Sequence, residues 1–417
     1  MKEFTLEDLN FGGTNYRNMI PQSRRLTWWG DQLVHLEAKE CYLVDKKTGK
    51  ETVFFTVDDI NEWMGCTPDN GLRSLNVARF PYADQPLVLL NHGGKRCLID
   101  FEQKKQVWHQ VNTDERQASS FNTASRYTAY VNGDQLYVRP ADSGKDDIKL
   151  TTDGSREIVY GQSVHRNEFG IHNGLFWSPD GMRLAFYRMD QSMVADYPQV
   201  NLFPRIAEHA PDKYPMAGET SHQVTVGVYD VETNKTIYLK AGDPTDRYFT
   251  NVAWSPDAKT IYMLELNRDQ NDCRLVSYDA VTGDRIAELY CETDAKYVEP
   301  QNPIQFLPWD ANKFILQSQK DGYNHLYLLD KTGKELRVAP ANPKTGEIEP
   351  EAVAALVEQV VLEASAAVAW KTFSICSSVV KAVVAVAELK PVPNAVLTCA
   401  SIWKLPLKKL LWVWKKK

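Results

Sequence analysis

Serine offers the most direct route to chemistry in this sequence, because it occurs twice in the same tetrad, Trp-Ser-Pro-Asp. The two copies place Ser178 and Ser255 after a short apolar run and before an alternating apolar segment. A nucleophilic serine needs a sharp, exposed elbow such as G-x-S-x-G and a base beside it. Neither serine has that setting. Since Pro fixes φ and Asp can hydrogen-bond to nearby backbone, we interpret both serines as β-turn residues, with the tryptophan packing between sheets.

Histidine, cysteine and glycine patterns give weaker signals. No Asp, Cys or Ser lies at a spacing typical of a catalytic or metal site from His165, His172 or His222. We therefore expect these histidines to be structural. The seven cysteines are scattered, without a C-x-x-C pair or a histidine at metal-ligand spacing, which predicts buried thiols and no metal or other cofactor. Gly93 and Gly94 are predicted to form a hairpin turn, because a phosphate loop requires G-x-x-x-x-G-K-[ST].

Six segments of the chain repeat one pattern: an alternating strand, a turn rich in Asp, Gly or Asn, and a second alternating strand. They span residues 26–45, 86–106, 121–142, 174–239, 251–290 and 304–338. Period-2 alternation between turn signals favours antiparallel sheets. Repetition of about four strands per unit is typical of β-propeller blades, whose faces are buried by neighbouring blades. The sequence therefore predicts an all-β fold, an incomplete β-propeller of about six blade-like units.

The composition changes after Ala339. Residues 340–417 lack Asp, Arg, Tyr and His, are rich in Ala and Val, and carry ten lysines against six glutamates. We predict a propeller region over 1–339 and an unrelated tail over 340–417, helical or disordered.

Charge and hydropathy exclude several classes of partner. The net charge of -6 gives no reason to expect nucleic acid binding. The start, MKEFTLEDLNFGG, has no basic n-region and apolar h-region, so we expect no export signal. The longest stretch without charged residues in the apolar C-terminal third, 391–403, is shorter than the roughly 20 residues of a membrane span. We expect no transmembrane helix and no membrane partner.

Several motifs together resemble a known family. They are SVHRNEFGIHNGLFWSPDGMRLAFYRMDQSMVADYP, VTVGVYDVETNKTIYL, LELNRDQNDC, YVEP and SQKDGYNHLYLLD. Over residues 4–338 the chain resembles the N-terminal β-propeller of dipeptidyl peptidase IV from Bacteroidetes-type bacteria, in the prolyl oligopeptidase family of serine peptidases. The resemblance implies an eight-bladed propeller joined to an α/β-hydrolase domain, and release of dipeptides with Pro or Ala in second position from free N termini.

The chain departs from that family plan in two ways. It contains no G-x-S-x-G, and only six of the eight expected units are recognised before the tail begins. We interpret this as a frameshift, a truncation or a miscalled gene end, with a genuine short paralogue as the alternative. The chain is expected to be catalytically inactive, with no catalytic residues of its own. A non-enzymatic peptide- or protein-binding scaffold, or a hydrolase domain supplied by a separate chain, remain alternatives.

The resemblance also implies a site for the peptide N terminus. The family carries two adjacent glutamates that bind the substrate's α-ammonium group; here Glu168 fits the second position and Asn167 stands at the first. The family's substrate-binding arginine has no firm counterpart, since its neighbourhood offers only Arg126 and Arg139. The insertion at 189–218 corresponds to an arm that implies a homodimer, with a surface excursion as the alternative. Localisation is periplasmic or cell-envelope by resemblance, or cytoplasmic if the missing signal peptide prevents export.

Overall fold

The computed structural model describes residues 5–13, 15–16, 24–113, 115, 117–339, 348 and 352, and these form two compact units. Within the described residues, the first unit ends at His109 and the second begins at Gln110. Apart from Ile348 and Ala352, the predicted tail at 340–417 lies outside the described residues.

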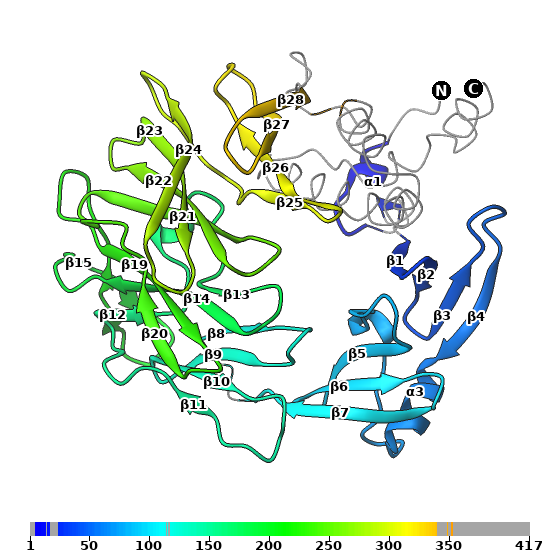
Figure 1. The fold of residues 1–417 in the computed structure, drawn as a ribbon. Coiled ribbons are helices and arrows are strands. Elements are labelled where there is room, and N and C mark those ends of the chain that lie inside the picture. Colours follow the sequence, from blue (N-terminus) through cyan, green and yellow to red (C-terminus); the bar gives the residue numbers. More distant parts are fainter. Residues whose placement is uncertain are drawn as a thin grey trace, which may run out of the picture. The chain divides into compact units, whose positions relative to one another are not determined.

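The first unit holds two antiparallel sheets, drawn in blue and cyan in Figure 1. The first sheet comprises β1 (Arg25–Trp29), β2 (Gln32–Leu36), β3 (Glu40–Val44) and β4 (Glu51–Thr56). The second comprises β5 (Leu87–His92), β6 (Lys95–Asp100) and β7 (Lys105–Val111), the last of which crosses the unit boundary. The Gly93-Gly94 hairpin turn is confirmed, because His92 pairs with Lys95 across it.

Short helices complete the first unit: α1 (Leu6–Leu9), α3 (Val57–Met64) and the 3-10 turn η1 (Leu75–Val77). α3 was not predicted, although its start carries a capping box. The Thr56 hydroxyl accepts from the Asp59 amide, and the Asp59 carboxylate accepts from the Thr56 amide. Gly65 ends the helix in the left-handed conformation. The sequence signal was present but lay inside a segment dominated by strand patterns.

The second unit holds four larger sheets, green to yellow in Figure 1, and two short two-stranded ladders. The third sheet contains β8 (Ala118–Phe121), β9 (Thr128–Asn132), β10 (Gln135–Arg139) and β11 (Ile148–Lys149). The fourth contains β12 (Ile158–Tyr160), β13 (Leu175–Trp177), β14 (Arg183–Asp190), β19 (Gln223–Asp230) and β20 (Lys235–Tyr238). The fifth contains β21 (Arg247–Trp254), β22 (Thr260–Asn267), β23 (Asp272–Asp279) and β24 (Arg285–Thr293). The sixth contains β25 (Gln305–Leu307), β26 (Asp310–Ser318), β27 (His325–Asp330) and β28 (Glu335–Ala339).

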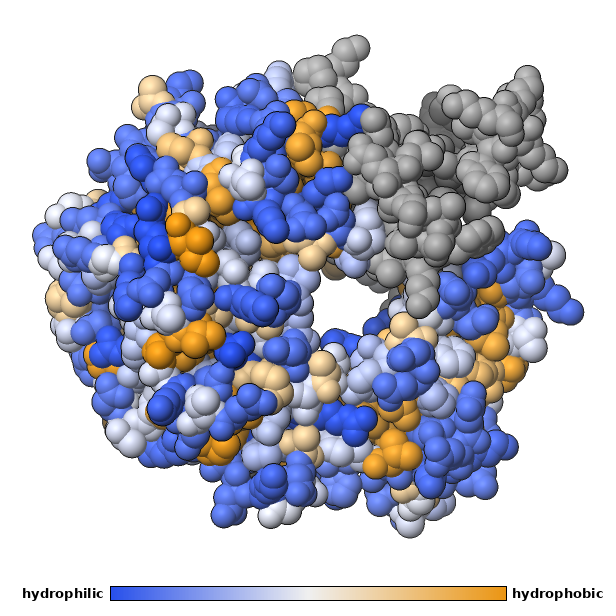
Figure 2. All heavy atoms as spheres, in the orientation of Figure 1, coloured by the Kyte–Doolittle hydropathy of each residue, from blue (hydrophilic) through white to orange (hydrophobic). Residues whose placement is uncertain are grey.

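All six predicted repeats therefore correspond to antiparallel sheets of the propeller type, and the all-β fold class is confirmed. Both faces of the middle strands supply the core: in the fifth sheet the successive residues Ile261 and Tyr262 of β22 and Leu275 and Val276 of β23 are all buried. On the face shown in Figure 2, polar residues dominate and apolar ones are scattered in small groups. This is the surface expected when sheet faces are buried and turns are exposed.

The two Trp-Ser-Pro-Asp tetrads form the same turn, which confirms the structural interpretation of both serines. Ser178 Oγ donates to Asp180 at 2.5 Å and accepts from the Arg183 amide at 2.9 Å. Ser255 Oγ donates to Asp257 at 2.6 Å and accepts from the Thr260 amide at 3.0 Å. Both serines are buried, so neither is presented to a substrate.

The tryptophans of the tetrads tie neighbouring sheets together, as predicted. The Trp177 indole donates to the Ser120 carbonyl of the third sheet at 2.9 Å. The Trp254 indole donates to the Phe176 carbonyl of the fourth sheet, also at 2.9 Å. The repeated tetrad is thus a repeated link between sheets.

Two described residues beyond Ala339 contact the sixth sheet. Ile348 and Ala352 pack with Trp309 against the buried cluster of Leu307 and Ile315. Among the described residues, no helix has the length and hydropathy of a membrane span, and no three His, Cys, Asp or Glu side chains gather as metal ligands.

Candidate functional site

The segment from Ser163 to Gly170 lies in the connection between β12 and β13 of the fourth sheet and has an unusual backbone conformation. It contains the 3-10 turn η2 (His165–Asn167), and positive φ angles of 52°, 57°, 65° and 58° occur at His165, Arg166, Asn167 and Phe169. Non-glycine residues in this region cost roughly 1–3 kcal/mol each unless the surroundings hold them in place. The segment therefore needs strong anchors on both sides. We call residues 163–170 the recognition segment.

The anchor at the start of the recognition segment is a buried histidine pair. His165 Nδ1 lies 2.8 Å from His222 Nε2, and His165 Nε2 accepts from the Phe249 amide at 3.2 Å. Since Nε2 accepts, the neutral ring carries its proton on Nδ1 and donates to His222. Burial, then the neighbouring His222, holds the pKa of His165 well below its usual range. Burial, with Arg166 and Arg268, lowers the pKa of His222 to about 4.

The anchor at the end of the recognition segment is apolar. Phe169 is buried in the core of the second unit, and its ring lies 5.2 Å from that of Tyr248. The same tyrosine meets the edge of His165 at 4.9 Å between centroids. Between these buried residues Arg166, Asn167 and Glu168 are exposed. The fold thus presents the three polar side chains on a short, fixed loop.

A cavity of about 210 Å³ lies beside the recognition segment. Its lining includes Asn167, Ser163, Arg166 and Lys213. The Ser163 hydroxyl donates to Asn167 Oδ1, so one lone pair of that oxygen is already used. The structure therefore places Asn167 on the wall of a cavity large enough for several water-sized groups.

Glu168, the other predicted site residue, follows Asn167 directly but is not among the residues that line this cavity. It is exposed, and its carboxylate makes no hydrogen bond or ion pair with any described residue. An exposed carboxylate on a rigid loop can accept hydrogen bonds from an ammonium group. The structure thus leaves Glu168 chemically available.

The arm between β14 and β19 reaches the recognition segment through Arg166. The arm consists of two short ladders, β15 (Asp196–Tyr197) with β18 (Asp212–Lys213) and β16 (Val200–Asn201) with β17 (Glu208–His209). Arg166 Nη1 donates to Asp212 at 3.0 Å, and the guanidinium lies 5.3 Å from the centroid of the Tyr214 ring. Sequence reasoning missed this contact, since nothing in HRNEFG indicates a partner 46 positions away.

Neither arginine considered as the family's substrate-binding residue lies in the recognition segment. Arg139 is buried in the third sheet, where its guanidinium binds Asp147 at 3.0 Å and faces the Tyr130 ring at 4.5 Å. Arg126 has a positive φ of 60° in the turn between β8 and β9. The contacts of Arg139 are those of a structural residue.

Comparison with known proteins identifies the family of this chain. Residues 92–360 match the family model described as the dipeptidyl peptidase IV N-terminal region, which includes the recognition segment, the arm and four complete sheets. The chain belongs to this dipeptidyl peptidase IV family. The match continues past Ala339, where the composition changes, and includes Ile348 and Ala352.

Solved structures agree with the dipeptidyl peptidase IV assignment. A protein described as dipeptidyl aminopeptidase IV of Bacteroides ovatus is 45% identical, with a TM-score of 0.70 over 80% of this chain and 46% of its own. Dipeptidyl peptidase 4 of Porphyromonas gingivalis is 20% identical, with a TM-score of 0.62 over 82% of this chain and 50% of its own, and supports the fold.

Curated relatives include fungal proteins named probable dipeptidyl-aminopeptidase B. That of Phaeosphaeria nodorum is 30% identical over 50% of this chain and 25% of its own length. That of Pyrenophora teres is 28% identical over 78% of this chain and 40% of its own length. The chain thus spans less than half the length of these curated relatives.

Proposed function

We propose that this chain is the substrate-gating, N-terminus-recognising propeller region of a dipeptidyl peptidase IV-like serine exopeptidase that releases X-Pro and X-Ala dipeptides. The observation that carries the proposal is the recognition segment, a rigid loop with an available carboxylate inside a region that matches the family model. Glu168 would accept hydrogen bonds from the α-ammonium group of the peptide, and Asn167 would contribute an amide oxygen.

Peptide binding to the purified chain tests this proposal. Ala-Pro amide should bind, and its N-acetylated form should bind at least tenfold more weakly, because acetylation removes the positive charge. Glu168→Gln should weaken the binding of Ala-Pro amide by a similar factor. Asn167→Glu should strengthen the binding, because it adds a second carboxylate. Isothermal titration calorimetry measures all four affinities, with Glu232→Gln on the exposed β19–β20 turn as the control for net charge. Equal binding of the free and acetylated peptides would contradict the proposal.

We further propose that the 417-residue polypeptide does not cleave peptides by itself. Its sequence contains no G-x-S-x-G, and the two serines in repeated tetrads are buried in turns. Release of a chromogenic group from a Gly-Pro substrate by the purified chain would overturn this. A binding scaffold is the alternative function, and a downstream reading frame without hydrolase codons would favour it.

The arm supports a second part of the proposal, a homodimer. Its tip exposes Leu202, Phe203 and Ile206 at 77%, 100% and 81% of their surface. Such a cluster at the end of a ribbon is typical of an interaction site. We expect Phe203→Asp to shift the chain toward monomer in size-exclusion chromatography with light scattering. Val281→Asp, which alters an exposed apolar residue in the fifth sheet's β23–β24 turn, is the matched control. An unchanged mass for Phe203→Asp would contradict the role of the arm.

A further inference from the structure

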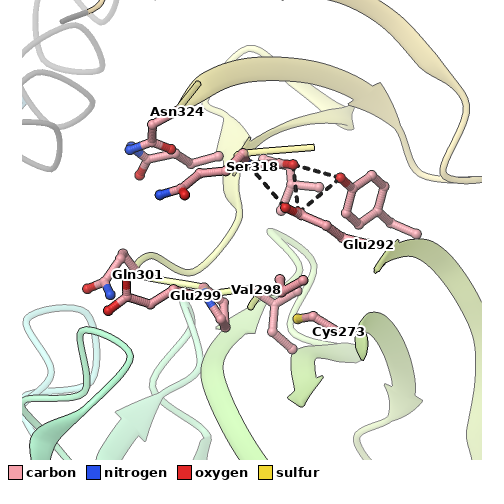
Figure 3. Close-up of a pocket in the computed structure, with 13 residues that line it drawn as sticks. Cys273, Glu292, Val298, Glu299, Gln301, Ser318 and Asn324 are labelled. Atoms are coloured by element: carbon pink, nitrogen blue, oxygen red, sulfur yellow. Dashed lines mark hydrogen bonds between the residues drawn. The ribbon is translucent and has the colours of Figure 1, made fainter. Parts of the chain in front are cut away.

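A small cavity in the second unit lies between the fifth and sixth sheets, and no part of the proposed function uses it. Its volume is about 20 Å³. Figure 3 shows Glu299 and Gln301 along one wall and Ser318 and Glu292 on the opposite wall. The first wall belongs to the connection between β24 and β25, and Ser318 ends β26. We call this the Glu299 cavity.

The Glu299 cavity is built directly against the recognition segment. Asn251, buried with a φ of 55°, donates from Nδ2 to the Phe169 carbonyl at 3.2 Å and to the Pro300 carbonyl at 3.4 Å. One residue further along each chain segment, a Cβ added to Gly170 would lie 1.9 Å from the Gln301 carbonyl oxygen. Since only glycine permits that approach, the two backbones touch there. Glu168 and Glu299 thus each lie two residues before this contact.

The lining of the Glu299 cavity contains acceptors of hydrogen bonds and no cationic side chain. Four carboxamides and two carboxylates face it: Gln301, Gln317, Gln319, Asn324, Glu292 and Glu299. The Glu292 carboxylate is already used, because it accepts from the Ser318 hydroxyl at 2.6 Å, the Tyr290 hydroxyl at 3.2 Å and the Gln319 amide at 3.3 Å. The Glu299 carboxylate has no hydrogen bond or ion pair with a described residue. Both carboxylates therefore lack a cationic partner among the lining residues, and the exposed Glu299 carboxylate lies beside carboxamide oxygens, a setting that attracts a cation.

Size selects among cations. A volume of about 20 Å³ holds one water-sized group. An ammonium group is a compact charge with three donors, whereas a guanidinium is a planar fork of five donors. The cavity therefore fits the head of a lysine and excludes that of an arginine.

We propose that the Glu299 cavity binds the side-chain ammonium group of a lysine at the first position of the peptide, which would make Glu299 a specificity-determining residue. The inference rests on the proposed function, in which Glu168 holds the α-ammonium group of the same lysine. The flexible four-carbon stem lets the second charge reach the neighbouring wall. Peptides that begin with Lys-Pro are then the preferred class.

Three dipeptide amides test the proposal by calorimetry with the full chain: Lys-Pro, norleucine-Pro and Arg-Pro. Norleucine keeps the apolar stem of lysine but lacks its charge. We expect Lys-Pro to bind about fivefold more tightly than norleucine-Pro, as for a partly exposed ion pair. Arg-Pro should bind no better than norleucine-Pro. In Glu299→Gln the lysine preference should vanish while the affinity for norleucine-Pro stays unchanged, and Glu232→Gln should keep the preference.

The variants separate the failure of this inference from the failure of the proposed function. Glu168→Gln should weaken the binding of Lys-Pro and of norleucine-Pro by the same factor. A lysine preference that is absent in the wild-type chain, or that persists in Glu299→Gln, would overturn the role of the Glu299 cavity while leaving Glu168 in place. Undiminished binding of both dipeptides to Glu168→Gln would overturn the proposed function, and binding of none of the three would overturn both. An unchanged melting temperature shows that Glu299→Gln folds normally.

Discussion

The fourth and fifth sheets are built in the same way, but of the two only the fourth carries the recognition segment and the arm. In both, the Trp-Ser-Pro-Asp turn joins two neighbouring strands, β13 to β14 and β21 to β22, and the tryptophan indole binds the preceding sheet. The fifth sheet is regular, with strands of eight or nine residues that follow one another through short turns. The fourth sheet has two short strands, β12 and β13, of three residues each, joined through the recognition segment, and an arm inserted between β14 and β19.

This difference shows that the repeated tetrad supports the sheets and does no chemistry. In the fifth sheet the chain runs straight into the tetrad along β21, whose residues pair with β22. In the fourth sheet the chain before the tetrad leaves the sheet and exposes Arg166, Asn167 and Glu168. The residues proposed to bind the peptide are therefore carried by the connection between β12 and β13, while the tryptophan of the tetrad links the sheet to its neighbour.

The largest expected difference between the two sheets concerns the tryptophans. Trp254 is 9% exposed and belongs to the large core of the second unit, whereas Trp177 is half-buried. Trp254→Ala should lower the free energy of unfolding by about 3–5 kcal/mol, and Trp177→Ala by about 2 kcal/mol, because less packing is lost. Urea denaturation followed by circular dichroism measures both. An equal or larger loss for Trp177→Ala would contradict the ranking.

A second prediction concerns the central cross-strand pair. In the fourth sheet Phe186 lies opposite Gly227, and in the fifth sheet Met263 lies opposite Val276. A Cβ on Gly227 would lie 2.4 Å from Cζ of the buried Phe186 ring.

Gly227→Ala should therefore destabilise the chain by an amount near the upper end of roughly 1–3 kcal/mol, since the ring must move within a packed core. Phe186→Leu combined with Gly227→Ala should recover part of that loss in the same urea experiment. A fully stable Gly227→Ala variant would show that the ring is not held in place.

The smallest predicted effect depends on pH and concerns His222, which pairs with His165 of the recognition segment. His222 has a folded-state pKa of about 4, below the unfolded value of about 6.5. The unfolded chain therefore binds more protons between these values, so the stability present at neutral pH is lost as pH falls. The contribution of His222 should drop by about 2 kcal/mol between pH 7 and pH 5.

The measurement is the free energy of unfolding of the wild type and His222→Gln at both pH values. His222→Gln should show a smaller loss on acidification, while His172→Gln, which alters an exposed histidine, should behave as the wild type. Parallel losses in all three proteins would assign the pH dependence to other groups.

Local sequence alone determined the sheets and their turns. Alternation, glycine-rich turns and the repeated tetrad were sufficient because each depends on residues a few positions apart, such as Ser178 with Asp180 and Arg183. The resemblance in HRNEFG likewise directed attention to Asn167 and Glu168. α3 was missed, because a capping box of two residues is a weak signal between strong strand patterns.

The contacts that build the site were decided only by the tertiary structure. His165 meets His222, and Asn251 joins Phe169 to Pro300, across separations that no local pattern encodes. The left-handed conformation of His165, Arg166 and Asn167 also has no local cause, since none is glycine. It persists because buried partners from distant strands outweigh its local cost, and those partners meet only when the sheets of the second unit have packed.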